Sequence, residues 1–106
     1  MAAVGFLVEL EAREGKADEL AEFLREARAL VDDEPGTVMW FAFRRGPRSF
    51  AIFDVFSDDA ARTVHLNGAV RSALERRGPD LLSARPVITP VDVETWKLPA
   101  SFEVGA

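Results

Sequence analysis

Apolar and polar residues alternate in two segments, one near each end of the chain, as expected of strands with one buried face. The first segment runs from Val4 to Ala12 and the last from Val87 to Lys97. Pro90 lies inside the last segment and has no N–H to donate to a sheet ladder. We therefore expect a strand at each end of the chain, the last one at a sheet edge or bulged at Pro90.

Two further segments carry apolar residues at spacings of three and four, the pattern of a helix with one buried face. The first spans Ala17 to Val31. The second runs from a capping residue at Ser57 or Asp58 to about Arg77. We expect the Asn67-Gly68 pair in its middle to bend or divide the second helix.

The stretch WFAFRRGPRSFAIFDVF at positions 40–56 is apolar on both faces, and Asp54 is the one charge inside its apolar runs. Its two halves predict strands at Thr37–Arg45 and Ser49–Phe56, joined by a tight turn. A turn symmetric about Gly46-Pro47 places Asp54 opposite Met39. In this register one face carries Trp40, Ala42, Phe53 and Val55, and the other carries Phe41, Phe43, Phe50, Ile52, Asp54 and Phe56.

The expected order is strand, helix, strand, strand, helix, strand, in a single domain over residues 1–106 with its core at about 4–97. Right-handed crossovers turn this order into a four-stranded antiparallel sheet with two helices on one face, the ferredoxin-like fold of the α+β class. No further element remains to cover the helix-free face, although the hairpin is apolar there. A second copy packed sheet to sheet would bury that face, so we expect a C2 homodimer.

Composition narrows the functions that are open to the chain. Its net charge of −5 disfavours electrostatic binding to nucleic acid or to an anionic membrane. It has no long apolar run and no signal-peptide pattern, so we expect a cytoplasmic protein. The absence of cysteine removes disulfides and thiolate chemistry, and a single histidine cannot build a multi-histidine metal site. No dinucleotide-binding fingerprint occurs either, so we expect neither a metal nor a cofactor.

Three stretches, EAREGKADEL, DDEPGTVMWF and FAIFDVFSDDAARTVHLNG, resemble the antibiotic biosynthesis monooxygenase superfamily, also called dimeric α+β barrel proteins. The resemblance covers roughly residues 4–97. Its most specific part is an acid two residues before a strand-ending aromatic, then a Ser-x-x-Ala helix start, and a histidine about nine residues after the aromatic. The matching positions are Asp54, Phe56, Ser57, Ala60 and His65.

The resemblance implies a homodimer whose paired sheets form a barrel, with a pocket between sheet and helices in each subunit. Some members oxidise quinols or polyketide phenols with O2 and no cofactor, and others degrade haem. The stretch HLNGAV lacks the second histidine that quinol-oxidising members often carry. The strand-one asparagine and late helix histidine of haem-degrading relatives are also missing, so haem is not expected.

His65 is the candidate general base, because imidazole is the side chain whose unperturbed pKa lies closest to neutrality. It could take the proton of a phenolic substrate and so make the electron-rich anion that reacts with O2. The alternative is a partly buried histidine bonded to a backbone carbonyl. On an unbroken helix His65 would point toward solvent, whereas a break at Asn67-Gly68 can turn it inward.

Asp54 is the candidate partner of His65, since a lone buried carboxylate has to be hydrogen-bonded, ion-paired, protonated or near a rim. In a functional pair it would orient the imidazole and favour its charged form. The alternative is a salt bridge to an arginine or a bond to a helix amide.

The remaining candidate residues would bind the substrate. Trp40, Phe41, Phe53 and Phe56 could line an aromatic pocket for a planar molecule, although aromatic residues on strands more often form core or interface. Asn67 could donate a hydrogen bond to a substrate oxygen, or serve the turn that follows it. We therefore hypothesise a cofactor-independent monooxygenase that oxidises a hydroquinone or polycyclic phenol with O2. The alternative is a non-catalytic homodimeric domain that binds a small hydrophobic ligand.

Overall fold

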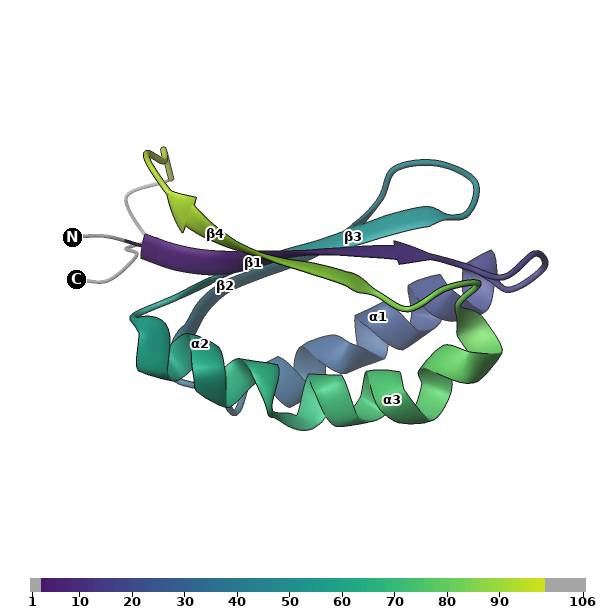
Figure 1. Ribbon diagram of the computed structural model, residues 1–106, viewed down its shortest axis with the longest axis horizontal. Coiled ribbons are helices and arrows are strands. Elements are labelled where there is room, and N and C mark those ends of the chain that lie inside the picture. Colours follow the sequence, from purple (N-terminus) through teal and green to yellow (C-terminus); the bar gives the residue numbers. More distant parts are fainter. Residues whose placement is uncertain (1–2, 99–106) are drawn as a thin grey trace.

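The computed structural model describes residues 3–98, in which one antiparallel sheet has all its helices on one face (Figure 1). The elements in chain order are β1 (Ala3–Glu11), α1 (Ala17–Val31), β2 (Thr37–Arg44), β3 (Ser49–Phe56), α2 (Asp59–Leu66), α3 (Ala69–Leu81) and β4 (Val87–Val93). The four strands lie in the order β2-β3-β1-β4. Element order and sheet order together confirm the predicted ferredoxin-like fold of the α+β class.

The second predicted helix is divided at Asn67-Gly68, as expected, with α2 before the pair and α3 after it. The carboxylate of Asp58 caps α2 by accepting a hydrogen bond from the Ala61 N–H at 2.8 Å. The expected end at about Arg77 is wrong, because α3 continues past Pro79. Proline has a helix-compatible φ, so Pro79 costs the last turn one hydrogen bond without ending it.

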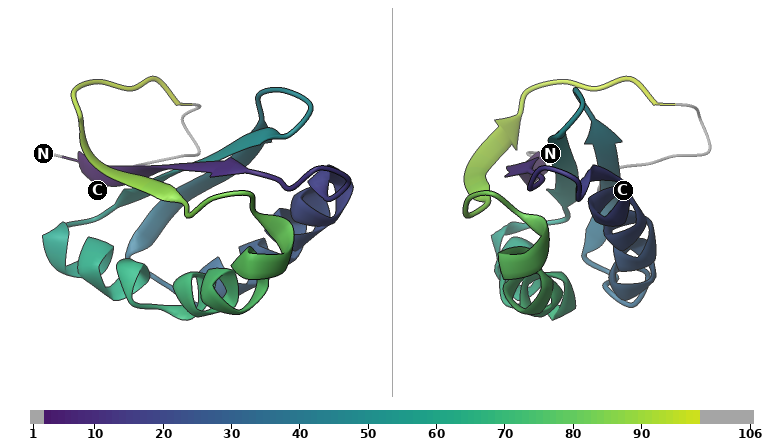
Figure 2. Two further views of the ribbon diagram at one scale, coloured as in Figure 1. Left: turned by 45° about the vertical axis from the view of Figure 1, so that its right-hand side comes forward. Right: turned by 90° about the vertical axis from the view of Figure 1, so that its right-hand side faces the viewer.

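The last strand is shorter than predicted, since β4 ends at Val93 and not at Lys97. β4 has a single neighbour, β1, and pairs with it through Pro90 opposite Phe6. The expected edge position of the proline is thus confirmed, and an edge strand tolerates the missing N–H. Figure 2 shows the segment after β4 crossing on the side of the sheet away from the helices.

The hairpin register differs by one residue from the expected one. Asp54 pairs with Trp40 and not with Met39, because the loop is centred on Pro47. A slip of one residue exchanges the two faces of a strand. The grouping of β2 is therefore corrected: Trp40 and Ala42 share the helix-facing side with Ile52 and Asp54, whereas Phe41 and Phe43 share the helix-free side with Phe53 and Ala51.

The hydrophobic core fills the space between the sheet and the helices. Its larger members come from the sheet and from helices α1 and α3, and include Phe6, Leu10, Leu20, Phe23, Phe50, Ile52, Phe56 and Leu81. The helix-free face is less covered, since Phe41 keeps 51% and Phe43 keeps 43% of its surface exposed. The described part of the chain thus buries one face of its sheet and leaves large aromatic side chains on the other.

Gly5 lies on β1 beside the backbone of Asp54 on β3, and alanine at this position is expected to destabilise the fold. A Cβ on Gly5 would lie 2.1 Å from the carbonyl oxygen of Asp54, a backbone atom that cannot move alone. Separating the two strands should lower the free energy of unfolding by roughly 2–3 kcal/mol and the melting temperature by about 10 °C. Thermal unfolding followed by circular dichroism measures both.

Gly46→Ala is the matched control for this experiment. A Cβ on Gly46 would meet its nearest heavy atom, Ser49 Cβ, at 3.8 Å, which is an ordinary contact. Its melting temperature should therefore stay close to that of the wild type. Equal melting temperatures for Gly5→Ala and the wild type would contradict the close strand approach.

Candidate active site

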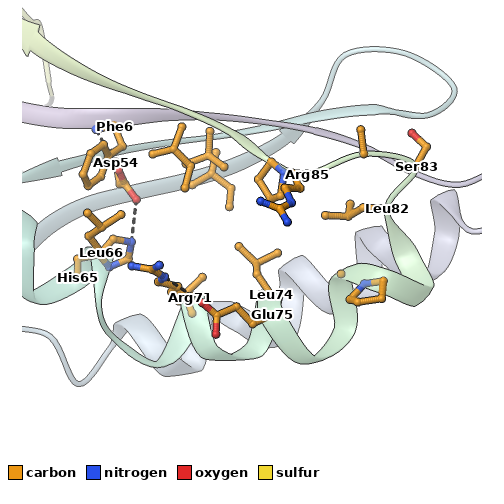
Figure 3. A pocket seen from close by; sticks show the side chains of 18 of the residues that line it. Phe6, Asp54, His65, Leu66, Arg71, Leu74, Glu75, Leu82, Ser83 and Arg85 are labelled. Atoms are coloured by element: carbon orange, nitrogen blue, oxygen red, sulfur yellow. Dashed lines mark hydrogen bonds and ion pairs between the residues drawn. The ribbon is translucent and has the colours of Figure 1, made fainter.

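Two titratable side chains from different elements meet beneath the sheet. Asp54 projects from the helix-facing side of β3, and His65 lies in the last turn of α2. Their Oδ2 and Nε2 atoms are 3.1 Å apart, and the two residues are 1% and 8% exposed (Figure 3). The other Asp54 oxygen, Oδ1, accepts a hydrogen bond from the Phe6 N–H at 3.3 Å. Within residues 3–98, Oδ2 has no partner besides His65.

A second carboxylate, Glu34, contacts the opposite nitrogen of the same imidazole. Its Oε1 lies 2.5 Å from His65 Nδ1 and also accepts a hydrogen bond from Thr37 Oγ1 at 2.8 Å. The side chain of Glu34 is 14% exposed. The sequence presents this residue only as part of the Glu34-Pro35-Gly36 stretch that follows a helix, and its role in the site was missed. The imidazole of His65 thus lies between two carboxylates.

The two carboxylates set the protonation of His65. Burial alone would lower the pKa of His65, but hydrogen bonds and charge from Asp54 and Glu34 outweigh burial and raise that pKa above 6.5. The imidazolium form is therefore more favoured than in a free histidine, with Nδ1 hydrogen-bonded to Glu34 and Nε2 in an ion pair with Asp54. The ring of Phe56 packs against the imidazole of His65, with 4.9 Å between the two ring centroids.

A cavity of about 790 Å³ lies next to the pair, between the sheet and α3 (Figure 3). Asp54 and His65 form part of its wall, and the segment 82–86 closes the far side. Most of the remaining wall is apolar and comes from the sheet and from one side of the helices, chiefly Phe6, Val8, Ile52, Leu66, Val70 and Leu74. The site therefore combines a titratable end with walls suited to a hydrophobic ring system.

The predicted aromatic residues are not gathered around this cavity. Phe41 and Phe53 pair on the helix-free side of the sheet, away from it. Phe56 is fully buried behind His65, and Trp40 packs against the core on the helix-facing side. The Nε1 atom of Trp40 is buried and has no hydrogen-bond partner within residues 3–98. The cavity wall is therefore aliphatic more than aromatic.

Asn67 uses both ends of its amide within the chain. Its Nδ2 donates to the Thr63 carbonyl at 3.1 Å, and its Oδ1 accepts from Arg71 Nη1 at 3.1 Å. Asn67 is also the C-cap of α2. It stands beside the cavity and holds Arg71, which is one of the residues that line it.

The described residues offer no cluster of His, Asp and Glu side chains suited to hold a metal ion. Asp54 and Glu34 contact opposite nitrogens of one ring, so the three groups do not converge on a common point. Between residues 3 and 98, no helix has the length and apolar character needed to cross a membrane.

Comparison with solved structures shows the same fold in several bacterial proteins. A protein of unknown function from Nitrosomonas europaea is 43% identical, with a TM-score of 0.90 over 94% of this chain and 97% of that one. A Pseudomonas aeruginosa protein is 19% identical, with a TM-score of 0.73 over 92% and 97%. A candidate antibiotic biosynthesis monooxygenase from Caulobacter crescentus is 20% identical, with a TM-score of 0.76 over 89% and 92%. At the two lower identities the likeness shows the fold alone.

Sequence comparison addresses the family directly. None of the curated proteins compared with the chain matches it. The family model for antibiotic biosynthesis monooxygenases matches residues 3–76, a span that holds Glu34, Asp54 and His65. This span is more than half of the 106 residues. The chain belongs to the antibiotic biosynthesis monooxygenase family.

Proposed function

We propose that the chain is a cofactor-independent monooxygenase that oxidises a hydroquinone or polycyclic phenol with O2. The observation that carries this proposal is the buried His65, held between two carboxylates at the wall of a largely apolar cavity. For a hydroquinone, one ring C–H becomes C–OH and both original hydroxyls become carbonyls. The two hydroxyl hydrogens leave with the second oxygen atom as water, so the substrate itself supplies the electrons.

His65 would act at the proton-transfer step of this reaction. In its neutral form it accepts the phenolic proton, and the phenolate that remains is the electron-rich species that reacts with O2. Asp54 and Glu34 stabilise the imidazolium that forms and fix the plane of the ring. The apolar walls would shield the buried side of the reactive anion from water. The proposed reaction uses no metal or cofactor. The cytoplasmic location expected from the sequence also stays a prediction.

A specific observation favours the alternative, a non-catalytic domain that binds a small hydrophobic ligand. Both ring nitrogens of His65 contact a carboxylate, so a substrate hydroxyl has to compete with Asp54 or Glu34 for the imidazole. Oxygen uptake by purified protein with a series of hydroquinones separates the two functions. Uptake that depends on His65 supports the monooxygenase, and ligand binding without uptake supports the alternative.

We further propose that the working unit is a C2 homodimer joined through the helix-free sheet face. Phe41, Phe43 and Val87 stand exposed on this face, where the described chain provides no helix to cover them. A second copy would bury these side chains against their own counterparts. The expected interface is on the order of 2,000 Å² in total, the size found in obligate dimers.

A glutamate on this face should break the dimer. Phe41→Glu would place a charge in the proposed interface, where it would lose its hydration without gaining a partner. Multi-angle light scattering at micromolar concentration should give the mass of two chains for the wild type and of one for the variant. Val64→Glu is the control, because Val64 is 65% exposed on α2, away from the sheet. A wild type that is monomeric would overturn the proposed assembly.

A further inference from the structure

The cavity carries a positive charge that the chain as a whole does not. Three arginines, Arg13, Arg71 and Arg85, lie on its wall together with His65, against two carboxylates, Asp54 and Glu75, while Glu34 contacts His65 from outside the wall. The whole chain, in contrast, has 13 Lys and Arg against 18 Asp and Glu. An excess of one sign of charge around a cleft raises the local concentration of ligands of the opposite sign. This distribution favours an anionic ligand in the cavity.

The carboxylates on the wall are already engaged, whereas cationic donors remain available. Asp54 is paired with His65, and Glu75 is paired with Arg71 at 3.0 Å. Arg13 donates its Nε–H to the Pro79 carbonyl at 2.9 Å. Arg85 makes no ion pair or side-chain hydrogen bond within residues 3–98, so its guanidinium can bind a ligand there.

Arg71 is held in a fixed orientation at the same cavity. Its Nε donates to Glu75 Oε1 at 3.0 Å and its Nη1 to Asn67 Oδ1 at 3.1 Å, which leaves the Nη2 hydrogens for a ligand. Figure 3 shows Arg71 on α3 and Arg85 on the segment before β4, and both residues line the cavity. Two arginines from different elements thus line the same largely apolar cavity.

We propose that the cavity binds a hydroxylated aromatic carboxylate, with its carboxylate held by Arg71 and Arg85 and its ring along the apolar wall toward Asp54 and His65. Guanidinium groups bind carboxylates through paired charge-assisted hydrogen bonds, which a neutral phenol cannot replace. The assignment names the substrate class of the proposed monooxygenase and rests on that function for its chemistry. The binding preference itself is measurable without turnover.

Isothermal titration calorimetry with a matched pair of probes tests the preference. 1-Hydroxy-2-naphthoate carries the acid, and 1-hydroxy-2-naphthamide has nearly the same shape without the charge. The acid should bind the wild type roughly tenfold or more tightly than the amide at low salt. That excess should shrink as salt screens the partly exposed arginines.

Substitutions locate the preference in the cavity. Arg85→Gln and Arg71→Gln should each weaken binding of the acid about tenfold and leave binding of the amide nearly unchanged. Arg76→Gln is the matched control, because it removes the same charge from α3 at an exposed position that does not line the cavity. Equal affinities of wild type for both probes would overturn the proposal. So would an equal loss in Arg76→Gln, or no binding of either probe at millimolar concentration.

Oxygen uptake separates this proposal from the proposed function. Selective acid binding without any uptake on hydroxylated aromatic acids or neutral hydroquinones supports the anion site and overturns the monooxygenase. Uptake that is equally fast on neutral and acidic hydroquinones, with equal affinity for both probes, supports the monooxygenase and overturns the anion site.

Discussion

Replacing His65 with alanine is expected to lower hydroquinone-dependent oxygen uptake by roughly a hundredfold or more, and to leave the proposed dimer intact. The reason is that His65 is the sole histidine of the chain and the proposed proton acceptor of the cavity. An oxygen electrode measures uptake with several hydroquinones, and light scattering checks the assembly. Without this base, the substrate would react only through the small fraction of its molecules that ionise to the phenolate unaided.

The alanine variant also leaves two nearly buried carboxylates without their shared cation, so lost activity alone could reflect lost structure. His65→Gln addresses this, because its amide still donates a hydrogen bond but exchanges no proton near neutrality. Its melting temperature should exceed that of His65→Ala, whereas its activity should be equally low. Val64→Ala changes an exposed neighbouring position on the same helix, so it is the control and should keep full activity.

Wild-type uptake by His65→Ala would give the histidine a purely structural role as the cation between Asp54 and Glu34. Wild-type uptake by His65→Gln alone would indicate that a hydrogen-bond donor, and not a base, is needed. A wild type that consumes no oxygen with any hydroquinone would favour the ligand-binding domain.

The fold could be predicted from the sequence because its signals are local. The alternation at Val4–Ala12 and the helical spacing at Ala17–Val31 each depend on neighbouring residues, and both elements form nearly as expected. The Asn67-Gly68 pair likewise predicted the division that turns His65 inward, where it is 8% exposed. Since these signals involve residues close in sequence, no knowledge of the tertiary structure was needed.

The hairpin register could not be predicted in the same way. Register is fixed by an apolar pattern only where one face is polar, and residues 40–43 are apolar on both faces. The predicted centre of the turn differed from the observed one by half a residue. This difference was enough to assign Trp40 and Phe41 to the wrong faces of the sheet. The loss of Phe41 and Phe53 from the predicted pocket follows directly from the pairing of these two residues on the helix-free face.

Glu34 was missed for a different reason. It lies 31 residues from His65 and follows a helix, where an acidic residue is usually solvated. Only the packing of the α1–β2 connection against α2 brings the two side chains together. The available signal was its position inside DDEPGTVMWF, one of the stretches that resemble the family, but that resemblance assigned it no role.

The pKa of His65 should fall when either carboxylate is neutralised, and this is directly measurable because the chain has one histidine. Its Cε1–H proton resonance can be followed against pH by NMR without assignment. Glu34→Gln and Asp54→Asn each remove a negative charge that favours the imidazolium, so both should lower the midpoint. Glu75→Gln is the control, since Glu75 lines the same cavity but pairs with Arg71.

The double variant Glu34→Gln, Asp54→Asn should reverse the sign of the shift. With both carboxylates neutral, burial is the main remaining influence, and it lowers the pKa of His65 below 6.5. The stability of the wild type should fall as pH rises from 6.5 through the raised pKa, because the folded state binds the proton more tightly. The double variant should instead gain stability as pH rises through its lowered pKa and 6.5, because its unfolded state binds the proton more tightly.

Oxygen uptake should follow the same titration if neutral His65 is the base. The activity of the wild type should then rise with pH through the raised pKa, and the rise should move to lower pH in both single variants. A midpoint that stays unchanged in Glu34→Gln would remove Glu34 from the site. A midpoint that moves in the NMR titration while the pH profile of activity stays in place would separate the ion pairs from catalysis.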